Sequence, residues 1–197
     1  MSFLQKIPRL LRWIFSVVLL LLAVMTIFRF IFFWAYNPPG KAFSGSAFIM
    51  GLRFDAGWAC GVGLAIMLLC AIPLLNPFKN GASKKIWNIF LSLLFIILLV
   101  FYGADYYHFD YLHQRLNATV LNYLQDAGIS FTMMRESYPL VKIIIAFIIL
   151  AALAWFAFRK LLSHFQQQEA YTQKKQIPFY IISFLILAQC IIGKIFV

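Results

Sequence analysis

The chain has 197 residues, of which 63% are hydrophobic and 12% are charged, and its formal net charge is +11. Soluble domains are about half apolar and about a quarter charged. This composition therefore excludes an ordinary soluble protein and requires lipid to cover part of the surface. The basic residues stand in short loops beside apolar runs, which favours a topological role in a membrane over nucleic-acid binding.

Five apolar runs predict the transmembrane helices of an all-α, polytopic membrane protein, because a helix needs about 20 apolar residues to cross a bilayer. The runs are continuous and do not alternate with polar residues, which excludes a transmembrane barrel. The sequence thus predicts a single five-span domain over residues 1–197, with spans at about 10–36, 56–75, 86–103, 140–158 and 177–197.

The first run carries basic residues before it and ends at "NPPG", residues 37–40. It is too long for a signal peptide and has no small-residue cleavage site, which indicates an uncleaved span. Arg29 stands near its far end, where we expect the side chain to extend to the interface.

In the second run, "GVG" at Gly61–Gly63 would allow a neighbouring helix to approach closely. Each of the three cysteines lies in an apolar run and indicates a packing residue.

Lysine and arginine divide unequally between the two sides of these spans. Ten of them, against one acid, lie in the N-terminal segment, in the loop around residues 79–85 and in the loop around residues 159–175. The remaining segments hold seven basic residues and five acids. The positive-inside rule then predicts a cytoplasmic N-terminus and an extracytoplasmic C-terminus, and it puts the long loop between the third and fourth spans outside.

The sequence of this outer loop predicts short interfacial helices. Asn117 suits an N-cap, an amphipathic pattern follows it, and Gly128 suits the C-terminal stop. Its acids and histidines also allow a metal site, since residues three apart share a helix face. The alternative is ordinary interfacial polarity, and no known metal motif is matched. The four candidate metal ligands are Asp105, His108, Asp110 and His113.

Charged residues recur where the predicted spans meet the outer space, and two interpretations remain open. Arginine–aspartate pairs can tie helix ends together, or the arginines can bind an anionic lipid head group, because a guanidinium matches a phosphate in a bidentate way. The candidate head-group residues are Arg53, Asp55, Asp105, Arg115 and Asn117.

Four short elements, "GLRFD", "DYY", "RLN" and "ESYP", stand in the order and spacing in which they occur in a known family. On these elements and the five-span layout, the chain resembles the lipoteichoic acid synthase-like family of phosphoglycerol transferases, which is grouped with the sulfatases. The resemblance covers essentially the whole chain. It implies a bacterial cytoplasmic membrane protein of the cell envelope.

In that family the five-helix domain precedes a large extracytoplasmic catalytic domain of the alkaline phosphatase type. That domain carries a threonine nucleophile and a divalent metal, often manganese, and moves glycerol phosphate from phosphatidylglycerol to an acceptor. No segment of this sequence corresponds to it, so the resemblance assigns no catalytic residue and no cofactor here, and we expect the chain alone to be inactive. A fragment, a natural truncation and a partner of a separately encoded catalytic chain remain alternatives.

The function that follows is that of a membrane module that anchors a phosphoglycerol transferase or sulfatase-like enzyme and presents anionic lipid, such as phosphatidylglycerol. Its partners would be that lipid and a downstream or separate catalytic domain. A non-enzymatic scaffold or assembly subunit is the alternative. A transporter is disfavoured, because the spans hold few charges at mid-depth and no paired Gly/Pro-interrupted helices.

Overall fold

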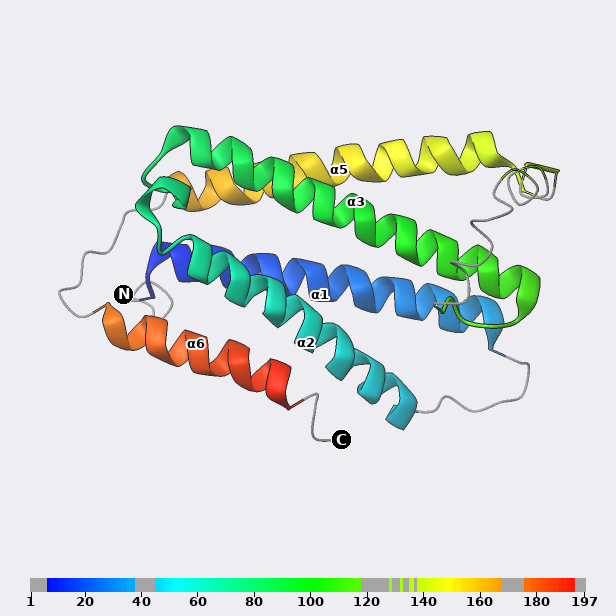
Figure 1. Cartoon of the computed structure of the whole chain (residues 1–197), viewed down its shortest axis with the longest axis horizontal. Helices are drawn as coiled ribbons and strands as arrows, with labels where there is room; N and C mark the ends of the chain where they lie inside the picture. The colour runs from blue at the N-terminus through cyan, green and yellow to red at the C-terminus, as the bar shows by residue number, and fades with distance from the viewer. Residues whose placement is uncertain are drawn as a thin grey trace. The chain divides into compact units, whose positions relative to one another are not determined.

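The computed structural model describes residues 7–37, 45–117, 128, 132, 135–136, 138–167 and 176–193, and over these residues the regular structure is entirely helical. Figure 1 shows the helices in chain order. They are α1 (Arg9–Tyr36), α2 (Gly45–Leu69), the short 3₁₀ helix η2 (Pro73–Leu75), α3 (Gly81–Leu112), α5 (Leu140–Gln167) and α6 (Ile177–Ile192).

The predicted all-α membrane architecture is confirmed in its coarse form. Four helices, α1, α2, α3 and α5, are long and apolar enough to cross a membrane, and α6 is a shorter apolar helix. The fifth span stays a prediction, and the interfacial helix expected after Asn117 lies outside the described residues. The main shift in position concerns α2, which begins at Gly45, well before the expected start of the second span at Ala56.

The chain divides into two compact units, of which unit 1 comprises Met1–Asn88 and Phe158–Val197. In unit 1, α2 packs between α1 and α6 (Figure 1). Gly63 lies at this crossing: a Cβ atom there would stand 2.5 Å from a methyl of Val18 on α1 and 3.5 Å from a methyl of Leu187 on α6. The close helix approach expected from "GVG" therefore occurs at Gly63, whereas Gly61 faces open space.

Aromatic side chains organise the end of unit 1 where α1 begins. The ring of Trp13 is almost completely buried and meets the rings of Phe78 and Trp87 edge-on, each with centroids 6.0 Å apart. The guanidinium of Arg9 lies over the Phe78 ring, 4.5 Å from its centroid. The Trp87 indole N–H donates to the Leu75 carbonyl at 2.6 Å, so the turn after η2 is fastened to α3.

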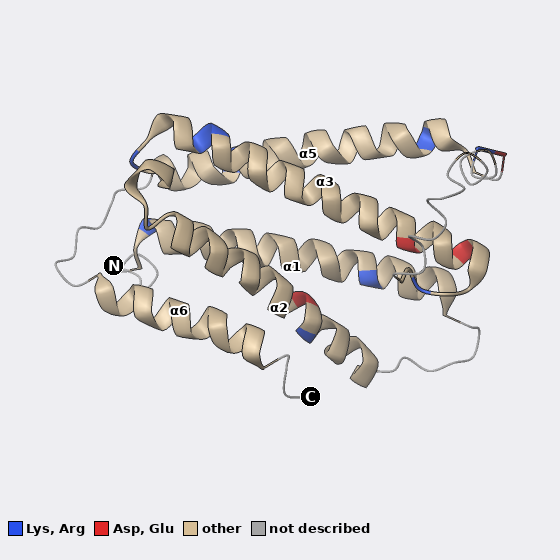
Figure 2. Ribbon diagram, viewed as in Figure 1, with Lys and Arg blue, Asp and Glu red and all other residues tan. Residues whose placement is uncertain are grey.

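Most of the described basic residues of unit 1 gather at this same end, as the blue segments at the start of α1 and α3 show (Figure 2). The end of α5 belongs to it as well, because Arg9 donates to the Gln166 carbonyl. These basic residues come from four segments of the chain, and none of the acids described in unit 1 lies in those segments. We call this region the basic end; its described members are Arg9, Arg12, Lys79, Lys84, Lys85, Arg159 and Lys160.

Unit 2 comprises Ile89–Ala157 and contains the second part of α3 and the first part of α5. These two helices approach closely at Gly103, where a Cβ atom would lie 2.9 Å from the Phe147 ring. The rings of Tyr107 and Tyr138 pack against each other with centroids 4.8 Å apart. Apart from such contacts α5 is exposed, because only 6% of its most apolar stretch is buried. The surroundings of this helix must therefore be apolar as well.

Candidate functional site

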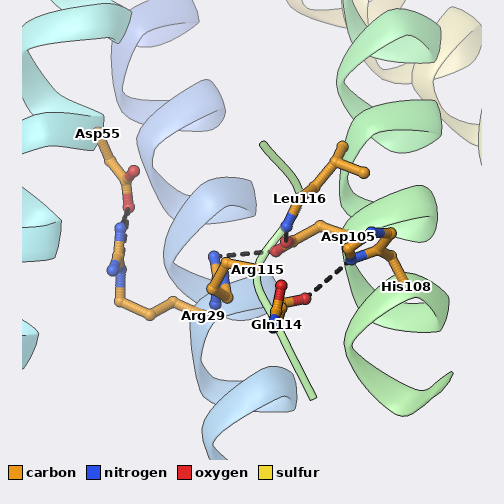
Figure 3. A network of polar contacts seen from close by, with 7 residues as sticks. All are labelled: Arg29, Asp55, Asp105, His108, Gln114, Arg115 and Leu116. Atoms are coloured by element: carbon orange, nitrogen blue, oxygen red, sulfur yellow. Dashed lines mark hydrogen bonds and ion pairs between the residues drawn. The ribbon is translucent and has the colours of Figure 1, made fainter. Parts of the chain in front are cut away.

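The most buried charged contact among the described residues joins α1 to α2. The guanidinium of Arg29 donates from Nη2 and Nε to one carboxylate oxygen of Asp55, Oδ2, at 2.7 and 3.1 Å. The side chain of Asp55 is 9% exposed and that of Arg29 is 30% exposed. Figure 3 shows the carboxylate of Asp55 pointing at the guanidinium. Arg29 thus meets an acid, because the early start of α2 brings Asp55 inside the helix to face it. That the Arg29 side chain extends to the interface stays a prediction.

A glycine makes room for this pair. Gly51 lies one helical turn before Asp55 on the same face of α2. A Cβ atom at Gly51 would stand 1.8 Å from Nη1 of Arg29 and 2.2 Å from its Cζ. Any larger residue at this position would therefore displace the guanidinium from its place across the α2 backbone.

Arg53 contacts the end of α6 and not the Arg29–Asp55 pair. Residues two apart on a helix point to nearly opposite sides, so Arg53 does not share the face of Gly51 and Asp55. It is exposed, and its Nη2 donates to the carbonyl of Gly193 at the end of α6. The carbonyls at a helix C-terminus carry partial negative charge, which suits this cation. Asp55 therefore pairs with Arg29 on α1 and not with the nearby Arg53.

In unit 2, the Asp105 carboxylate fastens the chain that leaves α3. Its Oδ2 lies 2.9 Å from Nη2 of Arg115, and its Oδ1 accepts the backbone N–H of Leu116 at 2.9 Å. Figure 3 shows these two contacts on the segment that turns back along α3. The side chain of Asp105 is 14% exposed, whereas that of Arg115 is 59% exposed. An arginine–aspartate pair exists here, as one of the two interpretations of the sequence expects.

The reversal itself is built at the end of α3. His113 has a φ of 53°, in the left-handed region that commonly ends a helix. Its N–H donates to the Phe109 carbonyl at 2.8 Å. The ring of His108 contacts the residue that follows His113, because its Nδ1 donates to the Gln114 carbonyl at 2.8 Å. That contact requires the tautomer with its proton on Nδ1.

Tyr138, just before α5, closes the contact between the two helices of unit 2. Its hydroxyl lies 3.2 Å from a carboxylate oxygen of Asp110 and 3.4 Å from the carbonyl oxygen of Tyr107. Burial, and then the hydrogen bond to Asp110, raise the pKa of the Tyr138 hydroxyl. A raised pKa keeps the phenol protonated, so it remains a donor to the carboxylate.

The four residues considered as metal ligands hold other contacts. Asp105 binds Arg115 and the backbone, His108 binds a carbonyl, Asp110 accepts the Tyr138 hydroxyl, and His113 forms the end of the helix. Across the described part of the chain, no group of three histidine, cysteine or acidic side chains is close enough to hold a metal ion. The sequence-predicted head-group residues thus fall into separate sets. Asp105 and Arg115 lie together in unit 2, while Arg53 and Asp55 lie on different sides of α2 in unit 1.

Asn117 is exposed and lies at the end of a described segment. The sequence interpretation missed the pairing of Arg29 with Asp55 and the role of Gly51, although a base inside one apolar run and an acid just before the next were a usable indication of the pair. Chemically, the described polar contacts offer guanidinium groups oriented by carboxylates, an arrangement suited to binding an anion. No family model, curated protein or solved structure matches the chain.

Proposed function

We propose that the chain is the membrane module of a cell-envelope enzyme of the phosphoglycerol-transferase and sulfatase type, and that it holds an anionic phospholipid such as phosphatidylglycerol in the outer leaflet. The observation that carries this proposal is that, of three segments bearing the family resemblance, the first contacts each of the other two. They are "DYY" and the residues just after it on α3, "RLN" after the reversal, and "ESYP" before α5.

The contacts between these segments are specific ones. Arg115 of "RLN" pairs with Asp105 of "DYY" at 2.9 Å. Tyr138 of "ESYP" meets Asp110 at 3.2 Å and packs on the ring of Tyr107. Short motifs that are separate in sequence and joined in space support the resemblance better than their order in the sequence does alone.

The arginines supply the chemistry for a lipid phosphate, because guanidinium groups form charge-assisted hydrogen bonds with phosphate oxygens. Arg53 contacts a backbone carbonyl, and within the described residues it has no carboxylate partner. Its positive charge is therefore not balanced by a neighbouring negative charge. The charge of Arg115 is partly balanced by Asp105. In this proposal Arg53 and Arg115 bind head groups, whereas Asp105 orients Arg115.

The proposal requires the ends of α3 to face opposite sides of a bacterial cytoplasmic membrane, with the basic end in the cytoplasm. Cysteines at Lys85 and Gln114 test this in a background without Cys60, Cys70 and Cys190, because both positions are exposed. An impermeant thiol reagent added to intact cells should label the Gln114 site alone. Labelling of the Lys85 site alone would reverse the orientation.

Transfer chemistry in this proposal belongs to an extracytoplasmic domain with its own divalent metal, which joins the module from the same or a separate chain. We therefore expect the purified chain to release no glycerol phosphate from labelled phosphatidylglycerol. Turnover above that of heat-inactivated protein would contradict this division of labour.

Lipid selectivity tests the function most simply. The chain is purified in detergent, incubated with equimolar phosphatidylglycerol and phosphatidylethanolamine, and analysed by native mass spectrometry. The proposal predicts that phosphatidylglycerol is retained preferentially, and that this preference weakens roughly tenfold for Arg53→Gln, since one charge-assisted hydrogen bond is lost. Equal retention of the two lipids by the unaltered chain would reject it.

A further inference from the structure

The Arg29–Asp55 pair lies well inside two helices that are apolar and long enough to span a bilayer. At about 1.5 Å per residue, Arg29 lies about 24 Å along α1 from Trp13, the first residue after the basic ones. Asp55 lies about 21 Å along α2 from its opposite end at Leu69. A hydrocarbon core is about 30 Å thick. Both helices therefore carry their charge at a similar depth, in the outer part of the core that lies farther from the basic end.

The pair uses only part of the hydrogen-bonding capacity of Arg29. Nε and Nη2 both donate to Oδ2 of Asp55, while Nη1 lies across the backbone at Gly51. A guanidinium has five N–H donors, so several remain beyond this carboxylate. The side chain is 30% exposed, so these donors are accessible. In an apolar surrounding an N–H group without an acceptor is strongly unfavourable, which means that an acceptor beyond the described residues is needed.

The local charge indicates which acceptor is suitable. Asp55 balances Arg29, but Arg53 stands two residues away on α2, and its partner within the described segments is the Gly193 carbonyl. This turn of α2 and its neighbour on α1 thus carry a net positive charge. A cation at this depth thins the bilayer locally and draws head groups toward it. A phosphate supplies both the oxygens and the negative charge that are missing.

We propose that Arg29 binds the phosphate of an anionic phospholipid through the donors that Asp55 leaves unused, with Asp55 as a positioning residue and Gly51 as the space in which the guanidinium lies. This inference rests on the proposed lipid-holding function and deepens it, because it assigns the phosphate contact to a residue outside the segments that carry the family resemblance.

The test compares four variants of the full chain, each measured for phosphatidylglycerol retention by native mass spectrometry and for thermal stability in detergent. Arg29→Gln removes the guanidinium. Arg29→Gln combined with Asp55→Asn leaves two neutral side chains that can still bond to each other, which restores stability that the single change loses. Asp55→Asn keeps the guanidinium and an oxygen to orient it. Lys85→Gln is the matched control, since it removes one exposed positive charge at the basic end.

We expect Arg29→Gln and the double variant to retain phosphatidylglycerol roughly tenfold less well, while Lys85→Gln retains it like the unaltered chain. Asp55→Asn should lie between these, because an amide oxygen orients the guanidinium less firmly than a carboxylate does. A double variant that recovers both stability and lipid retention would overturn the inference and make the pair purely structural.

Added glycerol phosphate distinguishes the source of the phosphate. Displacement of the lipid by this free anion at millimolar concentration would indicate a site for soluble phosphate esters and contradict a site for a phospholipid. If the unaltered chain shows no preference for phosphatidylglycerol, the proposed function fails as well. If it shows the preference and Arg29→Gln keeps it, this inference alone fails.

Discussion

The two arginine–aspartate pairs found among the described residues use the same groups in different settings. Arg29 and Asp55 come from two helices of unit 1, and their side chains are 30% and 9% exposed. Asp105 and Arg115 come from a helix end and the reversal that follows it in unit 2, and Arg115 is 59% exposed. The first pair is set in an apolar surrounding beside a glycine that makes room for it, whereas the second fastens a turn at the surface.

The difference teaches that the cost of losing one partner depends on the surroundings of the other. An exposed ion pair contributes about 0–1 kcal/mol, because water and salt screen it. Removing one partner of a buried pair leaves an uncompensated charge and costs about 3–5 kcal/mol. Substitutions at the two pairs and at the residues beside them should therefore differ widely in their cost.

Asp55→Ala should have the largest effect, since it leaves the Arg29 guanidinium without its carboxylate inside the helix pair. We expect a loss of about 3–5 kcal/mol in the free energy of unfolding, measured by denaturant titration in detergent micelles. Combining it with Arg29→Ala should recover much of the loss, because the uncompensated charge is then absent. A single variant as stable as the unaltered chain would mean that water or lipid already satisfies the pair.

Gly51→Ala should have an intermediate effect. Its Cβ atom would stand 1.8 Å from Nη1 of Arg29, so the guanidinium must shift and weaken its bonds to Asp55. We expect a loss of about 1–3 kcal/mol, in the range of overpacked sites. Gly61→Ala is the matched control on the same helix, because nothing lies within 4 Å of its added Cβ. Equal stability of the two variants would show that the guanidinium has no fixed place at Gly51.

Arg115→Gln should cost at most about 1 kcal/mol, and the cost should shrink as salt is raised, as for an exposed pair. Asp105→Ala should cost more than Arg115→Gln, because Asp105 also accepts the Leu116 N–H. The same denaturant titration at low and high salt checks both. A loss for Arg115→Gln as large as that for Asp55→Ala would remove the contrast between the two pairs.

His113→Gly should have the smallest effect. The φ of 53° at this position suits glycine better than other residues. We expect unchanged stability or a gain of a few tenths of a kcal/mol. Glycine removes the backbone strain at this φ, but its greater freedom in the unfolded chain offsets part of that gain. His113→Val should be less stable than either form, and thermal unfolding of the three proteins decides the order.

The helices were predictable because hydropathy alone identifies apolar stretches of this length. The start of α2 was not, because Arg53 and Asp55 lower the hydropathy of a segment that is still helical. Hydropathy measures transfer into lipid, and a helix continues past a charge whenever a neighbour satisfies it. That is why the expected span began at Ala56 and the observed helix begins at Gly45.

The candidate site was predictable only in part. Asp105 and Arg115 are close in sequence, so their pairing across a reversal was one of two open interpretations. Arg29 and Asp55 belong to different helices, and their pairing depends on how α1 and α2 pack, which no local pattern encodes. An acid and a base at similar depths in adjacent apolar runs, with a glycine one turn before the acid, is the pattern that would have indicated it.

If the Arg29–Asp55 pair binds lipid and is not only a structural tie, an experimental structure of the full chain in nanodiscs that contain phosphatidylglycerol will show it. We expect a lipid phosphate about 3 Å from the Arg29 guanidinium, with Asp55 still bonded to that guanidinium. A structure in which Arg29 meets only Asp55 and acyl chains, with every bound phosphate elsewhere, would contradict it.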